Sequence, residues 1–151
     1  MTGLVYNQVM ADCPKGTYTI PSSFGSNWSC VAISTTATIF PLAQYYCEAN
    51  YNGTLMTVPN GYINTILADF LEILSPKHWF YIGVTTEVGG VWKNVDDGQN
   101  TTFFNWYPGI SFSQCSMCAL MRFDGYWSWN YCYREYYYIC GFTKASSSET
   151  G

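Results

Sequence analysis

The segment VWKNVDDGQNTTFFNW, residues 91–106, decides the fold of the second half of this chain. It contains a short extended run over 91–95, a turn at Asp96, Asp97 and Gly98, and an aromatic run that ends at Trp106. Similar strand patterns flank it over residues 79–84, 118–123, 126–129 and 136–142, and Asp124-Gly125 marks a further turn. We therefore predict that this half consists of short β-strands.

The first half is predicted to contain a hairpin over residues 14–30 and then two helices. The first helix begins at Pro41 and ends at Asn52-Gly53. The second begins after the cap residue Asn60, ends at Ser75-Pro76, and has an apolar stripe at Ile63, Ile66, Leu67, Phe70, Leu71 and Leu74. Helices followed by a run of strands indicate an α+β fold.

Composition limits the function classes. The 151 residues suit one domain, 48% of them are apolar, and only 11% are charged, against about 25% in ordinary globular chains. The net charge of −4 argues against nucleic-acid binding, because such proteins need basic residues to neutralise phosphates. No apolar run approaches the length of about 18 residues that membrane insertion needs.

Seven cysteines, at 13, 30, 47, 115, 118, 132 and 140, favour an oxidising compartment. Asn27, Asn52 and Asn100 each begin an N-x-S/T glycosylation triplet. The first eleven residues lack a signal peptide, so we expect a secreted protein or ectodomain fragment whose signal has been removed. A zinc site at Cys115, Cys118, Cys132 and Cys140 is an alternative, although the second pair lacks tight spacing. Counting alone cannot select the disulfide pairs.

The order of these segments resembles a C-type lectin-like domain over residues 13–142. The resemblance rests on Ala43-x-x-Tyr46-Cys47 with Gly53-x-Leu55, Tyr81-Ile82-Gly83-Val84, Val91-Trp92 with Asp97-Gly98, Phe104-Asn105-Trp106, the spacing from Cys118 to Cys132, and Tyr138-Ile139-Cys140. It implies a disulfide-stapled α+β fold with two helices, short antiparallel sheets and a long irregular loop. Residues 1–12 would then be an N-terminal extension, and 143–151 a flexible Ser-rich tail.

The resemblance also implies the disulfides Cys13–Cys30, Cys47–Cys140 and Cys118–Cys132, which leaves Cys115 unpaired. An odd cysteine in a secreted protein is buried, capped by a small thiol, or paired with another chain. Cys115 lies between the polar residues Gln114 and Ser116. We therefore expect it to be accessible and to form a mixed disulfide or a disulfide-linked dimer.

Family members that bind sugar through calcium use E-P-N or Q-P-D in the long loop and N-D after the core tryptophan. Here the loop positions hold Ile110, Ser111 and Phe112, and the positions after Trp127 hold Ser128 and Trp129. Asp124 and Asn130 lie nearby in the chain but do not restore the pattern. Calcium needs six to eight oxygen ligands, so we predict neither a calcium site nor another cofactor.

Aromatic residues occupy the region instead, and we take Tyr107, Phe112, Tyr126 and Trp129 as candidate ligand-binding residues. They would stack on sugar rings or anchor a protein partner; the alternative is that they pack the loop onto its own domain. His78 is the only histidine and no motif marks a nucleophile, so we do not expect an enzyme. The predicted function is that of an extracellular module that binds carbohydrate without calcium. The alternatives are recognition of a protein surface and a structural spacer in a longer secreted chain.

Overall fold

The computed structural model describes residues 13–144. The predicted N-terminal extension, 1–12, and all of the predicted tail after residue 144 lie outside the described residues. In chain order the elements are β1 (Tyr18–Thr19), the 3-10 helix η1 (Ser22–Phe24), β2 (Cys30–Ile33), α2 (Phe40–Tyr51), β3 (Thr54–Leu55), α3 (Gly61–Leu74), β4 (Phe80–Thr85), β5 (Lys93–Asn94), β6 (Met117–Met121), β7 (Trp127–Tyr131) and β8 (Tyr137–Phe142).

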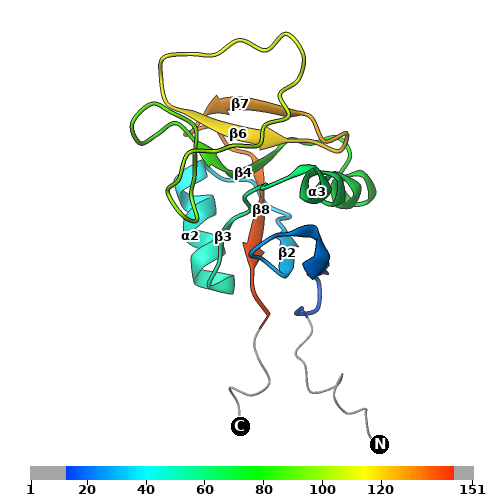
Figure 1. Ribbon diagram of the computed structural model, residues 1–151. Helices are drawn as coiled ribbons and strands as arrows, with labels where there is room; N and C mark the ends of the chain where they lie inside the picture. The colour runs from blue at the N-terminus through cyan, green and yellow to red at the C-terminus, as the bar shows by residue number, and fades with distance from the viewer. Residues whose placement is uncertain (1–12, 145–151) are drawn as a thin grey trace, which may run out of the picture.

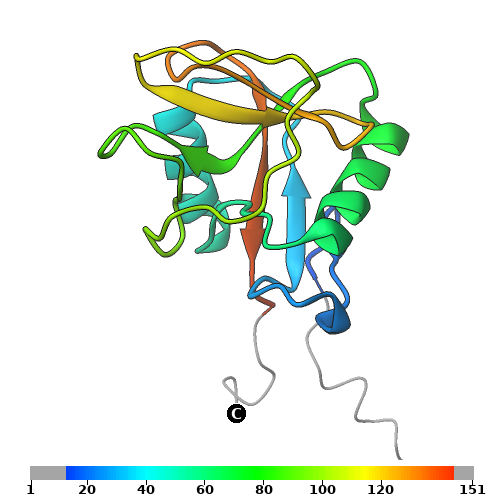
Figure 2. The same ribbon diagram turned by 45° about the horizontal axis from the view of Figure 1, so that its top comes forward.

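The strands form one mixed sheet in the order β1-β2-β8-β4-β6-β7. The pairing of β4 with β8 is parallel, and the other pairings are antiparallel. Strand β3 pairs with β8, and β5 pairs with β4. Helices α2 and α3 lie on opposite sides of β2 and β8 (Figures 1 and 2), so the predicted α+β class is confirmed.

Both helices have the termini that the sequence predicts. Pro41 lies in the first turn of α2, and Asn52 ends that helix with a left-handed φ of 56°. At the start of α3, the Asn60 side chain accepts a 3.0 Å hydrogen bond from the Ile63 amide. The predicted apolar stripe of α3 is wrong at Leu74. This residue is 43% exposed because the last turn of the helix extends beyond the core.

Three disulfides join the elements: Cys13–Cys30, Cys47–Cys140 and Cys118–Cys132. These are the pairs that the resemblance implies. The Cys47–Cys140 bond joins α2 to β8 across 93 residues, a loop closure that stabilises the fold by about 4.6 kcal/mol in the chain-entropy model. Because Cys118, Cys132 and Cys140 are all oxidised, the alternative of a four-thiolate zinc site is excluded.

Close packing explains the glycine in the Tyr81-Ile82-Gly83-Val84 motif. The Gly83 amide donates a 2.7 Å hydrogen bond to the Met56 carbonyl, and a β-carbon at Gly83 would collide with the Leu55 carbonyl. Strand β4 is buried along its whole length. Only glycine therefore allows β4 to lie this close to the segment that carries β3.

The predicted strand boundaries are wrong at several ends. Strand β5 has two residues where 91–95 was predicted, and Val91 is exposed. Strands β6 and β7 pair in register from Met117 opposite Tyr131 to Met121 opposite Trp127. Strand β7 therefore runs two residues further than predicted, while Tyr126 belongs to the preceding turn. Strand ends depend on the partner strand, which a local pattern does not contain.

Candidate functional site

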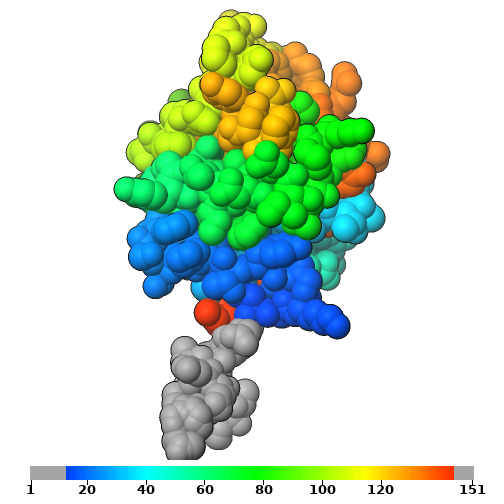
Figure 3. All heavy atoms as spheres, turned by 90° about the vertical axis from the view of Figure 1, so that its right-hand side faces the viewer, coloured from blue at the N-terminus to red at the C-terminus, as the bar shows by residue number. Residues whose placement is uncertain are grey.

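The long loop of residues 95–116 connects β5 to β6, and its later part rises beyond β6 and β7 at the top of Figure 1. Figure 3 shows the later, yellow part of this loop at the opposite end of the molecule from the N-terminal hairpin. Cys13 and Lys144 both contact the start of β2, through the Cys13–Cys30 disulfide and a 2.9 Å hydrogen bond from the Lys144 amide to Ser29 Oγ. The later part of the loop is therefore presented away from the two ends of the described chain.

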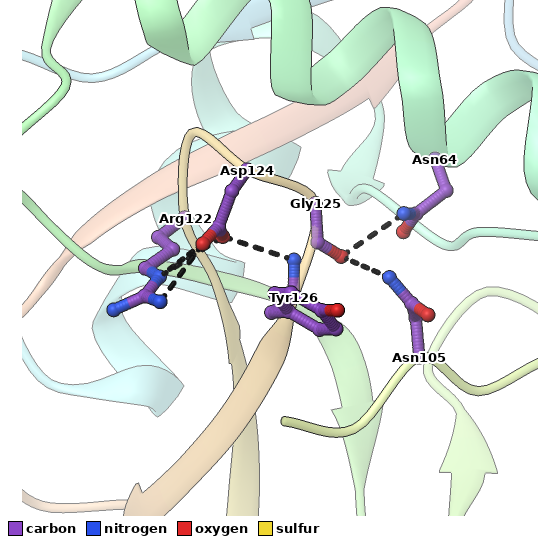
Figure 4. A network of polar contacts seen from close by, with 6 residues as sticks. All are labelled: Asn64, Asn105, Arg122, Asp124, Gly125 and Tyr126. Carbon is purple, nitrogen blue, oxygen red and sulfur yellow. Dashed lines mark hydrogen bonds and ion pairs between the residues drawn. The ribbon is translucent and has the colours of Figure 1, made fainter. Parts of the chain in front are cut away.

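A buried hydrogen-bond network fixes the base of this loop on α3 and β7 (Figure 4). The Gly125 carbonyl accepts hydrogen bonds from the side-chain amides of Asn64, at 3.0 Å, and Asn105, at 2.6 Å. The Asn64 side-chain oxygen in turn accepts a 2.7 Å hydrogen bond from the indole nitrogen of Trp127. Because these bonds are buried, they hold the β6–β7 turn and the loop in one relative position.

The backbone continues this attachment as far as Tyr107. The Trp127 amide donates to the Asn105 carbonyl at 2.8 Å, and the Tyr107 amide donates to the Trp127 carbonyl at 2.8 Å. Residue 106 forms an isolated parallel bridge with Trp127. The position of Tyr107 beside the edge of β7 is therefore fixed by hydrogen bonds, although the residue belongs to an irregular loop.

An ion pair orders the side chains around Tyr107. Arg122 and Asp124 approach to 2.8 Å, and the Tyr126 amide donates a 3.2 Å hydrogen bond to the same carboxylate (Figure 4). Desolvation alone would raise the pKa of Asp124, but the hydrogen bonds from Arg122 and the Tyr126 amide outweigh it, and the pKa is lowered. The hydrogen bond with Asp124 raises the pKa of Arg122. Both groups are therefore charged at neutral pH.

The guanidinium of Arg122 also lies between two aromatic rings. Its central carbon is 4.9 Å from the ring centre of Trp79 and 4.9 Å from that of Tyr107. The Tyr126 ring meets Tyr107 edge-on, with centroids 5.3 Å apart. Tyr107 is nevertheless 46% exposed.

A shallow hollow of about 240 Å³ lies at this position. We call it the Tyr107 hollow; it is lined by Trp79, Tyr107, Pro108, Gly109, Ile110, Arg122 and Ser128. Its lining combines aromatic ring surface with a guanidinium, a hydroxyl and loop backbone. Such a combination suits a polar ligand that also has an apolar face.

The other two candidate residues lie elsewhere on the loop end. The Trp129 indole nitrogen donates a 2.8 Å hydrogen bond to the Ser111 carbonyl, and its ring packs against Tyr131. Phe112 is 49% exposed and packs edge-on against Trp106, with centroids 5.1 Å apart. Part of each side chain therefore holds the loop, while part faces solvent.

The structure thus divides the four predicted residues into two pairs. Tyr107 contacts Tyr126, whereas Phe112 and Trp129 both adjoin Ser111; no ring contact joins the pairs within residues 13–144. Side chains alternate along β7, so Ser128 of the hollow and Trp129 point to opposite faces. Sequence reasoning missed the contributions of Asn64, Trp79 and Arg122. The signal that could have identified Asn64 was its polar side chain beside Ile63 and Leu67 of the apolar stripe.

The residues at and near the family's calcium positions do not fit a calcium ion. The Ser111 carbonyl accepts a hydrogen bond from the Trp129 indole. The Asp124 carboxylate forms an ion pair with Arg122 and accepts a hydrogen bond from the Tyr126 amide. Asn130 is occupied as well, because its amide nitrogen donates to the Tyr136 hydroxyl and its oxygen accepts from the Tyr131 amide, both at 2.7 Å. No set of free carboxylate and amide oxygens remains there to replace the water around a hard cation.

One cluster of three potential metal ligands occurs among residues 13–144, and it is not a metal site either. It consists of Glu87, Cys118 and Cys132. The sulfurs of Cys118 and Cys132 are bonded to each other, so neither is available as a thiolate ligand.

Two helices, a mixed sheet, three disulfides and a long exposed loop define the class of small, disulfide-stapled binding modules. The chain belongs to the C-type lectin domain family, whose model matches residues 36–142. Members of this family are generally binding modules without catalytic activity. Disulfide-rich domains of this kind are typical of extracellular proteins. Among curated proteins, none matches this chain in sequence.

Solved structures show the same fold. The mouse scavenger receptor C-type lectin carbohydrate-recognition domain superposes with a TM-score of 0.72 at 20% identity, over 88% of this chain and 98% of that one. Human lithostathine superposes with a TM-score of 0.72 at 20% identity, over 89% of this chain and 92% of lithostathine. A calcium-independent type II antifreeze protein superposes with a TM-score of 0.70 at 20% identity, over 89% of this chain and 97% of the antifreeze protein. The names of these three proteins describe different functions, so the fold does not select among them.

Within the part of the chain that the structure describes, no helix is both long and apolar enough to cross a membrane.

Proposed function

We propose that this protein is an extracellular module that binds carbohydrate without calcium, through the Tyr107 hollow. The observation that carries the proposal is the arrangement of Tyr107, which is 46% exposed and lies over the guanidinium of Arg122. Aromatic rings stack on the C–H faces of sugars, while donors at the edge bind the hydroxyls. Arg122 and Ser128 supply such donors beside the ring.

The hollow is ordered before any ligand binds. Arg122 is held by Asp124, and Tyr107 is held by Arg122, Tyr126 and its own backbone bond to Trp127. Fixing side chains in advance lowers the entropy that binding must remove, so a shallow site gains affinity.

Recognition of a protein surface is the second candidate. Phe112 is 49% exposed and has no hydrogen-bonding side-chain atom, and Tyr131 beside Trp129 is 41% exposed. Exposed aromatic groups of this kind are common anchors in protein interfaces. This candidate places the contact on the Phe112–Trp129 pair and not in the Tyr107 hollow.

A glycan array probed with and without a calcium chelator tests the proposal. Binding to a set of related glycans that survives chelation, and that is lost in Tyr107→Ala, supports it. Tyr133→Ala is the matched control, because Tyr133 is 70% exposed and lies outside the hollow. No binding to any glycan contradicts the proposal and favours the protein partner. Glycan binding that Tyr107→Ala leaves intact contradicts the Tyr107 hollow as the binding site.

A further inference from the structure

The Tyr107 hollow has one charged side chain in its lining. Among the described residues that line the hollow, Arg122 is the one that carries a charge, and the others offer aromatic, aliphatic, hydroxyl or backbone groups. Asp124, which forms the ion pair with Arg122, does not line the hollow. A ligand in the hollow therefore meets a cation, whereas the carboxylate that pairs with this cation lies outside.

Asp124 binds only one edge of the Arg122 guanidinium. Its carboxylate accepts hydrogen bonds from Nε at 2.9 Å and lies 2.8 Å from Nη2. A guanidinium has five N–H donors in a planar fork, so Nη1 and the second hydrogen of Nη2 form a further pair of parallel donors. Figure 4 shows the remaining nitrogen of the guanidinium pointing away from Asp124. The Nη1–Nη2 edge of Arg122 is therefore not used by the ion pair.

The guanidinium is held beside the ring surface of the hollow. Its central carbon lies 4.9 Å from the ring centre of Trp79 and 4.9 Å from that of Tyr107, and both rings line the hollow. The Arg122 side chain is 29% exposed, so the ion pair does not close it to solvent. A planar donor pair matches a planar carboxylate, and such charge-assisted bonds are stronger than those between neutral groups. A carboxylate is therefore the group that this edge recognises best.

We propose that the Tyr107 hollow selects sugars that carry a carboxylate, which binds the Nη1–Nη2 edge of Arg122 while the pyranose ring packs on Tyr107. This inference rests on the proposed function and names the class of sugar. Uronic acids and sialic acids both carry the required group. The net charge of −4 repels anions in general, so a preference for acidic sugars has to come from Arg122 locally.

The test compares two glycosides that differ in one group. Methyl β-D-glucuronide carries a carboxylate where methyl β-D-glucoside carries a hydroxymethyl group, and NMR titration of the full chain gives both dissociation constants. We expect the glucuronide to bind about fivefold more tightly, the contribution of a partly exposed charged pair, and to shift the Arg122 Nε–H resonance. The methyl glycoside of N-acetylneuraminic acid and its neutral methyl ester form a second matched pair. The two pairs distinguish uronic acids from sialic acids as the source of the carboxylate.

Arg122→Gln should bring the ratio of the two dissociation constants to one or below, because Asp124 is then uncompensated and repels an acid. The ratio is taken within one variant, so a displaced Tyr107 ring weakens both glycosides alike. Arg134→Gln is the matched control: it removes the same charge from an exposed position outside the hollow and should keep the wild-type ratio. If Arg122→Gln does not fold, Arg122→Lys replaces it, since lysine keeps the charge without the planar donor pair and should reduce the ratio.

Equal binding of the acidic and neutral glycosides, or Tyr107-dependent binding to neutral glycans alone, overturns this inference and leaves the proposed function intact. A preference for the acid that persists in Arg122→Gln also overturns it, because the cation responsible then lies elsewhere. If none of the glycosides binds and the glycan array shows no binding that depends on Tyr107, the proposed function fails and this inference fails with it.

Discussion

The indole nitrogen of Trp127 donates a 2.7 Å hydrogen bond to the side-chain oxygen of Asn64, across 63 residues of sequence. Trp127 is fully buried, and Asn64 is 6% exposed. Asn64 also donates to the Gly125 carbonyl, so one side chain on α3 satisfies a buried indole and positions the β6–β7 turn. The loop that carries the candidate ligand residues depends on this contact, since residues 105–107 are bonded to Trp127.

Replacing Asn64 with Ala should destabilise the fold. The change leaves the Trp127 indole without a partner and removes one of two donors to Gly125, which should lower the free energy of unfolding by about 2 kcal/mol. Urea denaturation followed by tryptophan fluorescence measures the loss. Thr65→Ala, at an exposed position of the same helix, is the control and should change stability little. Equal stability of the two variants would show that the Asn64 network does not support the loop.

Chelation of calcium should leave the protein unchanged. The oxygens at and near the family's calcium positions already form hydrogen bonds with Trp129, Arg122, Tyr126 and Tyr131, so a calcium ion would find few free ligands. We expect the melting temperature to be the same in calcium and in chelator. A saturable calcium isotherm at micromolar affinity, or a fall in melting temperature on chelation, contradicts this prediction.

Trp129→Ala should weaken ligand binding if the ligand contacts the Phe112–Trp129 pair, as the second candidate function requires. If the exposed part of the indole is an anchor for the ligand, the change reduces binding by about 1–3 kcal/mol. Titration calorimetry with a glycan selected on the array measures the effect. Because Trp129 also bonds the Ser111 carbonyl, Trp129→Phe, which lacks that donor, is measured in parallel. Unchanged binding in Trp129→Ala would assign the residue to loop packing alone.

The stability of the Arg122–Asp124 pair should depend on pH in the acid range. The folded-state pKa of Asp124 is lowered, so its stabilising contribution is fully present above the ordinary value of about 3.9 and is lost as the pH falls through the folded value. Both side chains are partly exposed, so the contribution is below about 1 kcal/mol. We compare the melting temperatures of wild type and Asp124→Asn between neutral and acid pH. Their difference should be constant above about pH 5 and shrink below it; a difference that grows on acidification is the opposite of the expected sign.

Cys115 should react with thiol reagents in the native protein. Its side chain is exposed and unpaired in a loop that projects from the end of the molecule. In oxidising medium we expect a disulfide-linked dimer or a mixed disulfide with a small thiol. Non-reducing electrophoresis and intact mass measure both, with Cys115→Ser as the monomeric control. A clean monomer that no thiol reagent labels is incompatible with this expectation.

Much of the fold was predictable because its signals are local. The 3.6-residue spacing from Ile63 to Leu71 and the cap at Asn60 identify α3 without reference to any other segment. The disulfide pairs required the resemblance, since spacing alone allows many sets. Strand ends were predicted less well: β7 continues to Tyr131 because Met117 pairs with that residue.

The candidate site was predictable only in composition. The sequence shows that aromatic residues replace the calcium ligands of the family at Phe112 and Trp129. It does not show that Arg122 lies between Trp79 and Tyr107, because that contact joins three segments through a turn and a loop.

The sequence by itself determined the class of this protein: an α+β C-type lectin domain with oxidised cysteines and without the family's calcium motif. The α+β class follows from residue types and short spacings, and the other properties follow from the resemblance of the sequence motifs to that family. Only the tertiary structure decided which of the candidate aromatic residues lie together, since it separated Tyr107 and Tyr126 from Phe112 and Trp129. The physical reason is that side chains alternate across β7 and hydrogen-bond partners such as Asn64 and Trp127 are chosen by packing of distant segments.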